Sequence, residues 1–351
     1  MPYRVIQWAT GSIGQIAIKA LTENPTFELV GVYVTSPEKA GRDAGELAGI
    51  SPLGIRATDR VDEITAIEAD CVHYAPLHAD LDDMCAILES GKNLVTPVGF
   101  VYPAAADGEA LQRLQAACAK GAVSLHGTGI HPGFSGDLLP LTFARLCRRI
   151  DRVIVQEVAD LTRHPSAAMM LEGLGFGRSR EECLTDPAPI VKTMDRIFAE
   201  SISLVAAGLG IGLRDITTEY DVAVATKELV VRTGSVPVGS VGGMRWVWTG
   251  WYRDEPVVEF RTFWKMGDDL DPDWGYENLK YSLLIEGDPS IRCGFEASTP
   301  TDENDPGLDG RIWTAMNGVN VIPAVCDAPP GIRTHLDLPF VRPLGLVAAA
   351  R

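Results

Sequence analysis

The stretch YRVIQWATGSIGQIAIKAL, residues 3–21, decides how this chain begins to fold. Val5 and Ile6 lie in a short, mostly apolar run, as a buried parallel strand requires. Glycines follow at positions 11 and 14, and apolar residues then recur with the spacing of one helix face. That face would consist of Ile13, Ile16, Ala17, Ala20 and Leu21. The segment therefore predicts a strand, a tight turn and a helix, in that order.

The turn has the pattern of a phosphate-binding loop. Ala9, Gly11 and Gly14 occupy the three positions of a G-x-G-x-x-G fingerprint, with alanine in place of the first glycine. Gly11 lets a pyrophosphate approach the backbone, Gly14 lets the helix lie against the strand, and the helix N-terminus faces the phosphates. We therefore expect a dinucleotide site here; the alternative is a structural βα turn. The site would comprise Ala9, Thr10, Gly11, Ser12, Ile13 and Gly14.

The second strand, Phe27–Val34, ends without the acid that normally binds the ribose 2′-OH of NAD. Thr35 and Ser36 stand there instead, and the cations Lys39 and Arg42 follow. Small hydroxyls beside positive charges suit a 2′-phosphate. The pattern favours NADP, or tolerance of both NADP and NAD. The alternative is that both cations are solvated charges on a helix surface.

Composition narrows the class of protein. The 351 residues are enough for two domains, and a formal charge of −16 argues against nucleic acid or an anionic membrane as partner. The seven cysteines form no C-x-x-C pair and are typical of reduced thiols. The first strand leaves no room for a signal peptide, and no apolar run approaches the ~20 residues that span a bilayer. We expect a cytoplasmic protein.

Strands and helices continue to alternate up to residue 126, which predicts a doubly wound, Rossmann-like parallel sheet with helices on both faces. Further strands are expected near Ile55 and over Cys71–Tyr74, Leu94–Thr96 and Val123–His126. Helices are expected over Ala40–Ala48, Val61–Ile67, Asp80–Glu89 and Asp107–Lys120. Ligands bind at the carboxyl ends of such strands. The cofactor contacts expected there are Ala75, Pro76, His78, Thr96 and Pro97.

Past Phe134, long alternating segments rich in Val, Trp and Phe predict a mostly antiparallel sheet. Its strands are expected over Arg152–Val158, Thr217–Val224, Arg245–Tyr252, Val257–Trp264, Leu283–Glu286 and Ile291–Phe295. Helices are expected over Leu138–Cys147, within the insertion 165–213, and over Ile312–Cys326. The fold class is therefore α/β, in which a Rossmann-like parallel sheet is joined to an α+β domain with a mostly antiparallel sheet.

These patterns also set the expected domains. Residues 1–134 would form the dinucleotide-binding domain, to which residues 311–351 return, and residues 135–310 would form the substrate and oligomerisation domain. The Pro-rich tail from Ala328 is expected to lack regular structure. An antiparallel sheet usually buries one face against helices or a second subunit, so we expect a homodimer.

Two loops carry a family resemblance. They are TPVGFVYP, residues 96–103, and GTGIHPGF, residues 127–134, the latter followed by DLLP at 137–140. With the first turn, they resemble the dihydrodipicolinate reductase-like oxidoreductases, the 2,4-diaminopentanoate dehydrogenases and the native amine dehydrogenases. The resemblance covers about the first 145 residues well and continues more loosely through 174–177 and 319–323. It implies a Rossmann domain, an α/β substrate domain, a dimer, and reduction of C=N bonds or oxidation of amines with NAD(P)H.

The chain departs from that family at two positions. In the diaminopentanoate and amine dehydrogenases, a carboxylate in the loop that matches 96–103 activates water or ammonia. Here Val98 and Gly99 stand at those positions, and from the start of this loop the first acid is Asp107. The asparagine of the family's GTGINP segment is His131 in this chain. The first departure puts amine dehydrogenation in doubt, and the second introduces an ionisable group.

Hydride transfer needs a proton donor or acceptor near the substrate heteroatom. His131 has a pKa range that suits proton transfer, and Tyr102 has a hydroxyl that can donate. Either residue would alternatively be structural. Glu157, or Asp160 beside it, would replace the missing loop carboxylate if a dry pocket raised its pKa; the alternative is a solvent-facing strand acid.

The substrate pocket is expected to take apolar walls from both domains, although such residues are more often simply core. The residues that we assign to it are Phe134, Met169, Phe176 and Asn317. The histidines are too dispersed for a metal site. The leading hypothesis is an NAD(P)H-dependent oxidoreductase that acts on a C=N bond or amine carbon of a small, largely apolar substrate. The alternatives are an NAD(P)-dependent alcohol or aldehyde dehydrogenase and a non-catalytic NADP-binding sensor.

Overall fold

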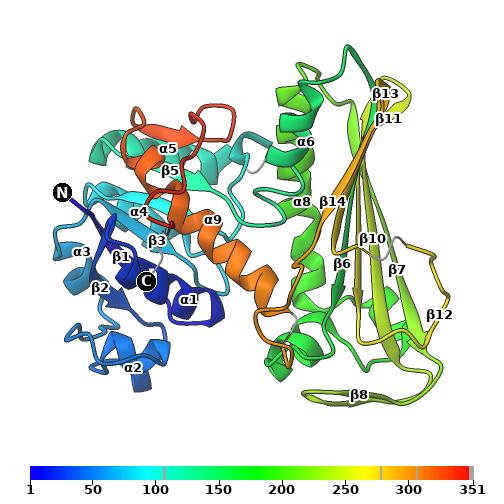
Figure 1. The fold of residues 1–351 in the computed structure, drawn as a ribbon, viewed down its shortest axis with the longest axis horizontal. Helices are drawn as coiled ribbons and strands as arrows, with labels where there is room; N and C mark the ends of the chain where they lie inside the picture. The colour runs from blue at the N-terminus through cyan, green and yellow to red at the C-terminus, as the bar shows by residue number, and fades with distance from the viewer. Residues whose placement is uncertain (106–107, 277–278, 306, 348–351) are drawn as a thin grey trace. The chain divides into compact units, whose positions relative to one another are not determined.

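The computed structural model describes residues 1–105, 108–276, 279–305 and 307–347, and the chain divides into two compact units (Figure 1). Unit 1 contains residues 1–134 and 310–351, and unit 2 contains residues 135–309. The predicted helix Asp107–Lys120 begins at a position outside the described residues, and from Gly108 onward it is present.

Within the described residues, unit 1 holds a six-stranded sheet in the order β15-β5-β4-β3-β1-β2, and every neighbouring pair is parallel. The strands are β1 Tyr3–Trp8, β2 Phe27–Tyr33, β3 Cys71–Tyr74, β4 Asn93–Thr96, β5 Ser124–Gly127 and β15 Gly331–Arg333. The order reverses between β1 and β3, and this switch point is where open α/β sheets bind ligands.

Helices cover both faces of this sheet, as predicted. They are α1 Ser12–Glu23, α2 Ala44–Ala48, α3 Val61–Ala66, α4 Leu81–Glu89, α5 Gly108–Gly121 and α9 Leu308–Cys326, with 3₁₀ turns η1 Pro37–Lys39 and η2 Pro103–Ala105. Val5 packs on one face with α1 and α9, whereas Ile6 packs on the other with α4 and α5. Adjacent strand residues point to opposite faces, so one strand serves two cores.

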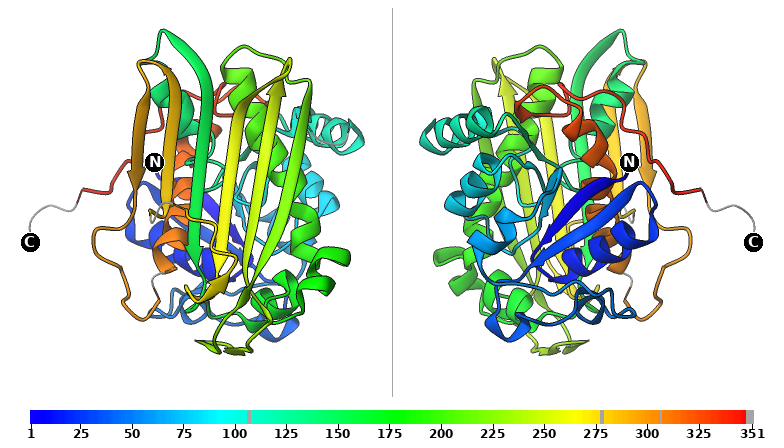
Figure 2. Two further views of the ribbon diagram at one scale, coloured as in Figure 1. Left: turned by 90° about the vertical axis from the view of Figure 1, so that its right-hand side faces the viewer. Right: turned by 90° about the vertical axis from the view of Figure 1, so that its left-hand side faces the viewer.

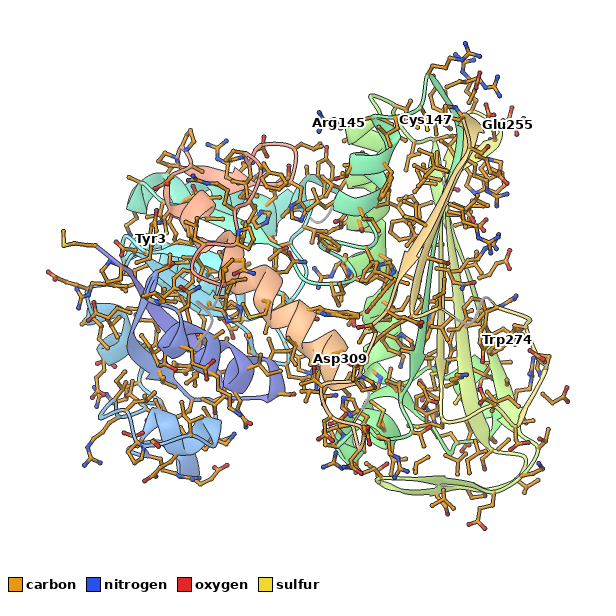
Figure 3. All side chains as sticks on the ribbon, in the orientation of Figure 1. Tyr3, Arg145, Cys147, Glu255, Trp274 and Asp309 are labelled. Carbon is orange, nitrogen blue, oxygen red and sulfur yellow. The ribbon has the colours of Figure 1, made fainter. Side chains whose placement is uncertain are left out.

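The last long helix, α9, belongs to unit 1 although its sequence follows unit 2. The Tyr3 hydroxyl, labelled in Figure 3, donates to both carboxylate oxygens of Asp327 at 3.3 Å and ties the start of β1 to the end of α9. The chain then adds β15 beside β5. The expectation that the tail lacks regular structure is therefore wrong over Gly331–Arg333, because an open sheet edge offers backbone partners that the tail sequence does not reveal.

Three other local predictions need correction. The buried face of α1 consists of Gly14, Ala17, Ile18 and Leu21, and Ile13 and Ile16 are only partly buried. The predicted helix Ala40–Ala48 begins at Ala44, because the Asp43 carboxylate caps it by accepting from the Gly45 N–H at 2.7 Å. The strand near Ile55 is present only as isolated bridges at Arg56 and Thr58.

Within the described residues, unit 2 holds a seven-stranded sheet in the order β12-β7-β10-β11-β6-β13-β14. Its strands are β6 Arg149–Asp160, β7 Asp215–Ala225, β10 Val241–Tyr252, β11 Glu255–Lys265, β12 Leu270–Asp271, β13 Tyr281–Asp288 and β14 Ile291–Phe295. The pairs are antiparallel except β6 with β11, which are parallel. The hairpin of β8 Leu229–Val231 and β9 Gly234–Val236, and β12, were not predicted.

The helices of unit 2 lie on one face of its sheet (Figure 2). They are α6 Leu138–Ala144, the π-helix η3 Ala168–Leu174, α7 Arg180–Thr185 and α8 Pro189–Gly208. The predicted helix Leu138–Cys147 thus ends at Ala144. Phe198 of α8 stacks on Trp248 of β10 with ring centroids 4.1 Å apart. Val153 and Val155 of β6 share this covered face.

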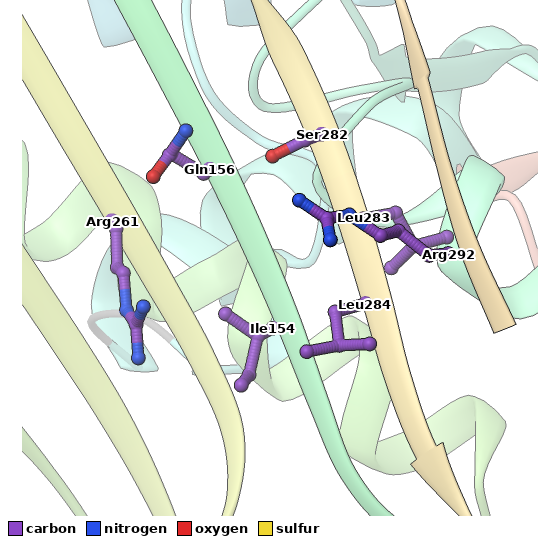
Figure 4. A pocket seen from close by; sticks show the side chains of 7 residues that line it. All are labelled: Ile154, Gln156, Arg261, Ser282, Leu283, Leu284 and Arg292. Carbon is purple, nitrogen blue, oxygen red and sulfur yellow. The ribbon is translucent and has the colours of Figure 1, made fainter. Parts of the chain in front are cut away.

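The opposite face of the sheet, which we call the outward face, is more polar. Side chains of β6, β11, β13 and β14 line a pocket there (Figure 4). Labelled in that view are Ile154, Gln156, Arg261, Ser282, Leu284 and Arg292. Among the helices of the described residues, none is both long and apolar enough to cross a membrane.

Candidate active site

The turn between β1 and α1 has the shape that a diphosphate needs. Gly11 precedes α1 as its N-cap and no side chain caps the helix, so the first backbone N–H groups face outward. A Cβ built on Gly11 would meet no atom within 4 Å, which leaves open space beside those groups. A Cβ on Gly14 would lie 2.1 Å from the Ala9 carbonyl oxygen. These residues fit a dinucleotide diphosphate, with Gly14 allowing the close helix–strand contact.

Ala9 takes the conformation of the glycine that it replaces. Its φ is +71°, in the left-handed region that alanine rarely adopts. Gln7 Nε2 holds this turn by donating to the carbonyl oxygens of Trp8 at 2.9 Å and Ala9 at 3.0 Å. His73 Nδ1 lies 2.8 Å from Gln7 Oε1, so it must carry the proton that it donates there. Sequence reasoning missed Gln7, although a polar residue inside a buried strand is a usable signal.

Side chains that follow β2 reach the same turn. Lys39 Nζ donates to Thr10 Oγ1 at 3.4 Å, so two predicted cofactor residues that are 29 positions apart lie together. Thr35 is exposed and Ser36 is partly exposed. The Arg42 guanidinium is exposed and, within the described residues, forms no ion pair. Two cations, Lys39 and Arg42, therefore follow β2, and Lys39 reaches the phosphate turn.

The ends of β3 and β4 supply further predicted contacts. Ala75 is buried and its N–H donates to the Trp8 carbonyl at 3.1 Å, which places it beside the end of β1. Pro76 is partly exposed, whereas His78 projects into solvent. Thr96 is fully buried, and its Oγ1 accepts from the Val98 N–H at 3.1 Å. Thr96 thereby shapes the loop that begins at Pro97.

The loops 96–103 and 127–134 fold against each other in unit 1. The Thr128 N–H donates to the Thr96 carbonyl at 2.8 Å. A Cβ on Gly127 would lie 2.2 to 2.3 Å from the Phe100 backbone, and Phe100 itself has φ +61°. Tyr102 is partly buried at the far end of the first loop. The structure thus joins the two predicted loops and stores backbone strain where they meet.

Asn317 is predicted to face the substrate, but its Nδ2 donates to the Gly129 carbonyl at 2.7 Å. It therefore fixes the histidine-bearing loop from α9. In the same loop, burial lowers the pKa of His131 from its usual 6.5 to about 3. An imidazole with this pKa is neutral near pH 7. Phe134 is partly buried at the end of this loop.

In unit 2, the two candidate acids differ. Asp160 is exposed and its carboxylate accepts from the Thr162 N–H at 2.9 Å. Glu157 is only 8% exposed, so the alternative of a solvent-facing acid is wrong for it. The Tyr281 hydroxyl donates to Glu157 Oε1 at 3.1 Å, and burial raises the pKa of Glu157 to about 7. Tyr281 was missed, because its partner lies 124 residues away.

The residues of unit 2 that were predicted to form apolar walls of the substrate pocket differ from Glu157 and Tyr281, because they belong to the apolar core or pack against it. Phe176 is 2% exposed and belongs to the unit's core, and Met169 packs against that core from η3. Their contact with a substrate stays a prediction.

No group of three or more His, Cys, Asp and Glu side chains that would suit a metal ion occurs in the described part of the chain.

Comparison with known proteins identifies the family. The family model of the 2,4-diaminopentanoate dehydrogenase C-terminal domain matches residues 134–350, and that of the dihydrodipicolinate reductase N-terminus matches residues 5–99. An amine dehydrogenase from Streptomyces virginiae is 30% identical over an alignment of 359 positions, gaps included, that covers 97% of each chain. The chain belongs to the 2,4-diaminopentanoate and amine dehydrogenase family.

Further relatives agree with this family. The 2,4-diaminopentanoate dehydrogenase of Acetoanaerobium sticklandii is 26% identical over 97% of this chain and 94% of its own. The solved amine dehydrogenase of Mycobacterium smegmatis has the same fold, with a TM-score of 0.81, 23% identity and 97% of each chain covered. The predicted resemblance and fold class are confirmed. The protein is a nicotinamide-nucleotide-dependent oxidoreductase of the amine dehydrogenase family.

Within this family, the resemblance places an asparagine where His131 stands. The low pKa of the buried imidazole removes the difference in charge between the two side chains. A neutral imidazole can donate one hydrogen bond and accept another, as an amide can.

Proposed function

We propose that this protein is an NADP-preferring amine dehydrogenase that acts on the amine carbon, or on the C=N bond, of a small and largely apolar substrate. The observation that carries the proposal is the open, uncapped helix N-terminus at Gly11, in a chain of the amine dehydrogenase family. The substrate size and apolar character follow from the apolar residues that the sequence assigns to the pocket.

Each part of unit 1 has a role in this proposal. The uncapped N–H groups at the start of α1 would bind the diphosphate, and the loops 96–103 and 127–134, which are hydrogen-bonded to each other, would border the nicotinamide. When bound, the cofactor accepts a hydride from the amine carbon or returns one to the C=N carbon. Neutral His131 and the Tyr102 hydroxyl orient the substrate through hydrogen bonds.

NADP is preferred, in this proposal, because the residues after β2 are hydroxyls and cations. Lys39 already lies within hydrogen-bond distance of Thr10 in the phosphate turn, and Arg42 is exposed next along the chain. A 2′-phosphate would gain charge-assisted hydrogen bonds from such groups. NAD has no 2′-phosphate, so it would not gain these hydrogen bonds.

The test follows absorbance at 340 nm with NADP and with NAD. The substrate panel contains primary amines, alcohols, and ketones with and without ammonia. Amine-dependent reduction of NADP, and ammonia-dependent oxidation of NADPH, are expected. The proposal would be rejected if the protein oxidised none of the amines and reduced none of the ketones in the presence of ammonia.

An alcohol or aldehyde dehydrogenase is the second candidate, because Val98 and Gly99 leave the loop 96–103 without a carboxylate. Reduction of a carbonyl without ammonia would support that reaction. Tight NADP binding without turnover of any compound in the panel would support the third hypothesis, a non-catalytic NADP-binding sensor.

We also propose a homodimer that pairs through the outward face of the unit 2 sheet. On that face Glu259, 6% exposed, lies between Arg152 and Arg261, and Phe263 lies 6.1 Å from the Trp274 ring, which Figure 3 labels. Arginine and aromatic side chains are enriched at interfaces between proteins. Light scattering should give the mass of two chains, and Arg261→Glu should shift it toward one.

A cytoplasmic location is part of the same proposal. All seven cysteines lie in the described part of the chain and are free thiols. Free, scattered cysteines are typical of a reducing compartment. Fractionation of cells that express a tagged chain tests this location.

A further inference from the structure

One cross-strand row of the unit 2 sheet is polar on the otherwise apolar covered face. The strand register pairs Glu157 of β6 with Tyr281 of β13 on one side and with Thr262 of β11 on the other. The next row on the same face is apolar and pairs Val155 with Leu283 and Phe260. We call Glu157, Tyr281 and Thr262 the acid row. Polar groups gathered in one row of an apolar face need a physical reason.

The acid row is buried but incompletely hydrogen-bonded. Exposure is 8% for Glu157, 2% for Tyr281 and none for Thr262. Tyr281 donates to Oε1, while within the described residues Glu157 Oε2 and Thr262 Oγ1 have no hydrogen-bond partner. Buried polar atoms are nearly always paired, and an unpaired carboxylate oxygen is costly. The two open acceptors, on neighbouring strands, match the N–H groups of one amine.

The groups around Glu157 that shift its pKa are consistent with a carboxylate that binds an amine. Burial raises the pKa of its carboxyl to about 7, while the Tyr281 hydroxyl, the Trp264 indole N–H and the charge of Lys280 lower it. The Trp264 nitrogen is near enough to act on that pKa, yet neither it nor Oε2 has a hydrogen bond of normal geometry in the described residues. A carboxyl of this kind exchanges protons near neutral pH.

We propose that Glu157 binds the amino group of the substrate and removes its proton, with Tyr281 as positioning residue and Thr262 as second acceptor. The proposal rests on the proposed amine dehydrogenase function. In the step, an N–H bond of the substrate ammonium breaks, its electron pair stays on nitrogen, and the proton passes to Oε2. The neutral amine then has the lone pair that forms the C=N bond as hydride leaves the carbon.

The central variant is Glu157→Gln, which keeps the shape and removes the charge. Its matched control is Glu259→Gln, a carboxylate that is also buried but lies on the outward face. General acid–base groups contribute roughly 100- to 10,000-fold. With amine and NADP, kcat/KM should fall at least about 100-fold in Glu157→Gln and lose its acid-side pH dependence. Glu259→Gln should keep that pH dependence.

A second measurement does not depend on turnover. Calorimetric titration of wild type with the primary amine hexylamine should show binding that Glu157→Gln weakens at least about tenfold, as expected for loss of one charged hydrogen bond. NADP affinity should be the same in both proteins. Amine binding that depends on Glu157 without any turnover would reject the proposed function and keep this inference. A Glu157→Gln protein with wild-type kcat/KM and amine affinity would overturn the inference alone.

Tyr281→Phe tests the positioning role through a readout that simple loss of packing would not move. The variant removes a hydrogen bond that lowers the pKa of Glu157. The acid limb of the pH profile should therefore move to higher pH, and Tyr252→Phe on β10 should leave it in place. An unmoved limb in Tyr281→Phe would overturn the assignment of Tyr281.

Discussion

Two glycines in the first turn should respond in opposite ways when each gains a side chain. A Cβ on Gly14 would lie 2.1 Å from the Ala9 carbonyl oxygen and 3.1 Å from Gln7 Nε2. The oxygen belongs to the backbone and cannot rotate away, so α1 would have to move from β1. A Cβ on Gly11 would meet no atom within 4 Å. Gly14→Ala therefore tests helix packing, and Gly11→Val tests the open space beside it.

The expected loss of stability follows from this geometry. Overpacking costs typically ~1–3 kcal/mol, and alanine recovers roughly 1 kcal/mol of helix propensity over glycine. Because α1 also buries Ala17, Ile18 and Leu21, its displacement loosens the core. Because the clash is with a backbone oxygen, the upper part of that overpacking range, about 2–3 kcal/mol, applies, and Gly14→Ala should lower the free energy of unfolding by about 1–2 kcal/mol. Gly11→Val puts a poorer N-cap residue at an exposed position, so it should lower the free energy of unfolding by no more than about 1 kcal/mol.

Cofactor affinity should show the reverse order. The Gly11→Val side chain would fill the space that the diphosphate needs beside the start of α1. A hydrogen bond to a charged group is worth about 1.5–3 kcal/mol, which corresponds to roughly 10- to 150-fold in Kd. The Kd of Gly11→Val for NADP should rise by at least the lower of these factors.

Urea unfolding followed by circular dichroism gives the stabilities, and calorimetric titration with NADP gives the affinities. The stability of Gly11→Val shows that weaker binding does not come from unfolding. Unchanged NADP affinity in a folded Gly11→Val protein would refute the assignment of the diphosphate to this turn. Wild-type stability of Gly14→Ala would refute the packing argument.

Two further predictions concern charge. Lys39→Ala and Arg42→Ala should each raise the Kd of NADP roughly tenfold and leave the Kd of NAD unchanged. Calorimetric titration measures both values, and Lys19→Ala is the control. Equal losses of affinity for both nucleotides would contradict a contact with the 2′-phosphate. Burial lowers the pKa of His131 from 6.5 to about 3, so between these values the unfolded chain binds more protons and stability is lost as pH falls. Between pH 7 and pH 5 the wild type should therefore lose about 2 kcal/mol of its free energy of unfolding through this histidine. His131→Asn should not show that loss, and urea unfolding at the two pH values measures it. The same pH dependence in both proteins would argue against a buried, neutral imidazole.

Local patterns were enough to predict much of this fold. The predicted bounds of β3, Cys71–Tyr74, and β14, Ile291–Phe295, agree with the structure. The order of strand, turn and helix around Gly11 is also confirmed. Alternation of side chains and glycine spacing are properties of neighbouring residues, so a sequence displays them directly. The family resemblance depends on the same short segments, and comparison confirms it.

Other features needed packing between distant segments. The buried side of α1 turned toward Ile18 because Gly14 sets how the helix approaches β1. The tail paired as β15 because β5 offered a free edge. Neither effect has a local signature, since each depends on the shape of a neighbour.

The sequence by itself determined that this chain begins with a strand, a glycine turn and a helix and that it belongs with the amine dehydrogenases, because those signals lie in consecutive residues. Only the tertiary structure decided which titratable groups carry charge. Burial keeps His131 neutral, and strand register sets Glu157 beside Tyr281 across 124 residues. Desolvation depends on everything that surrounds a side chain, and that environment exists only after folding.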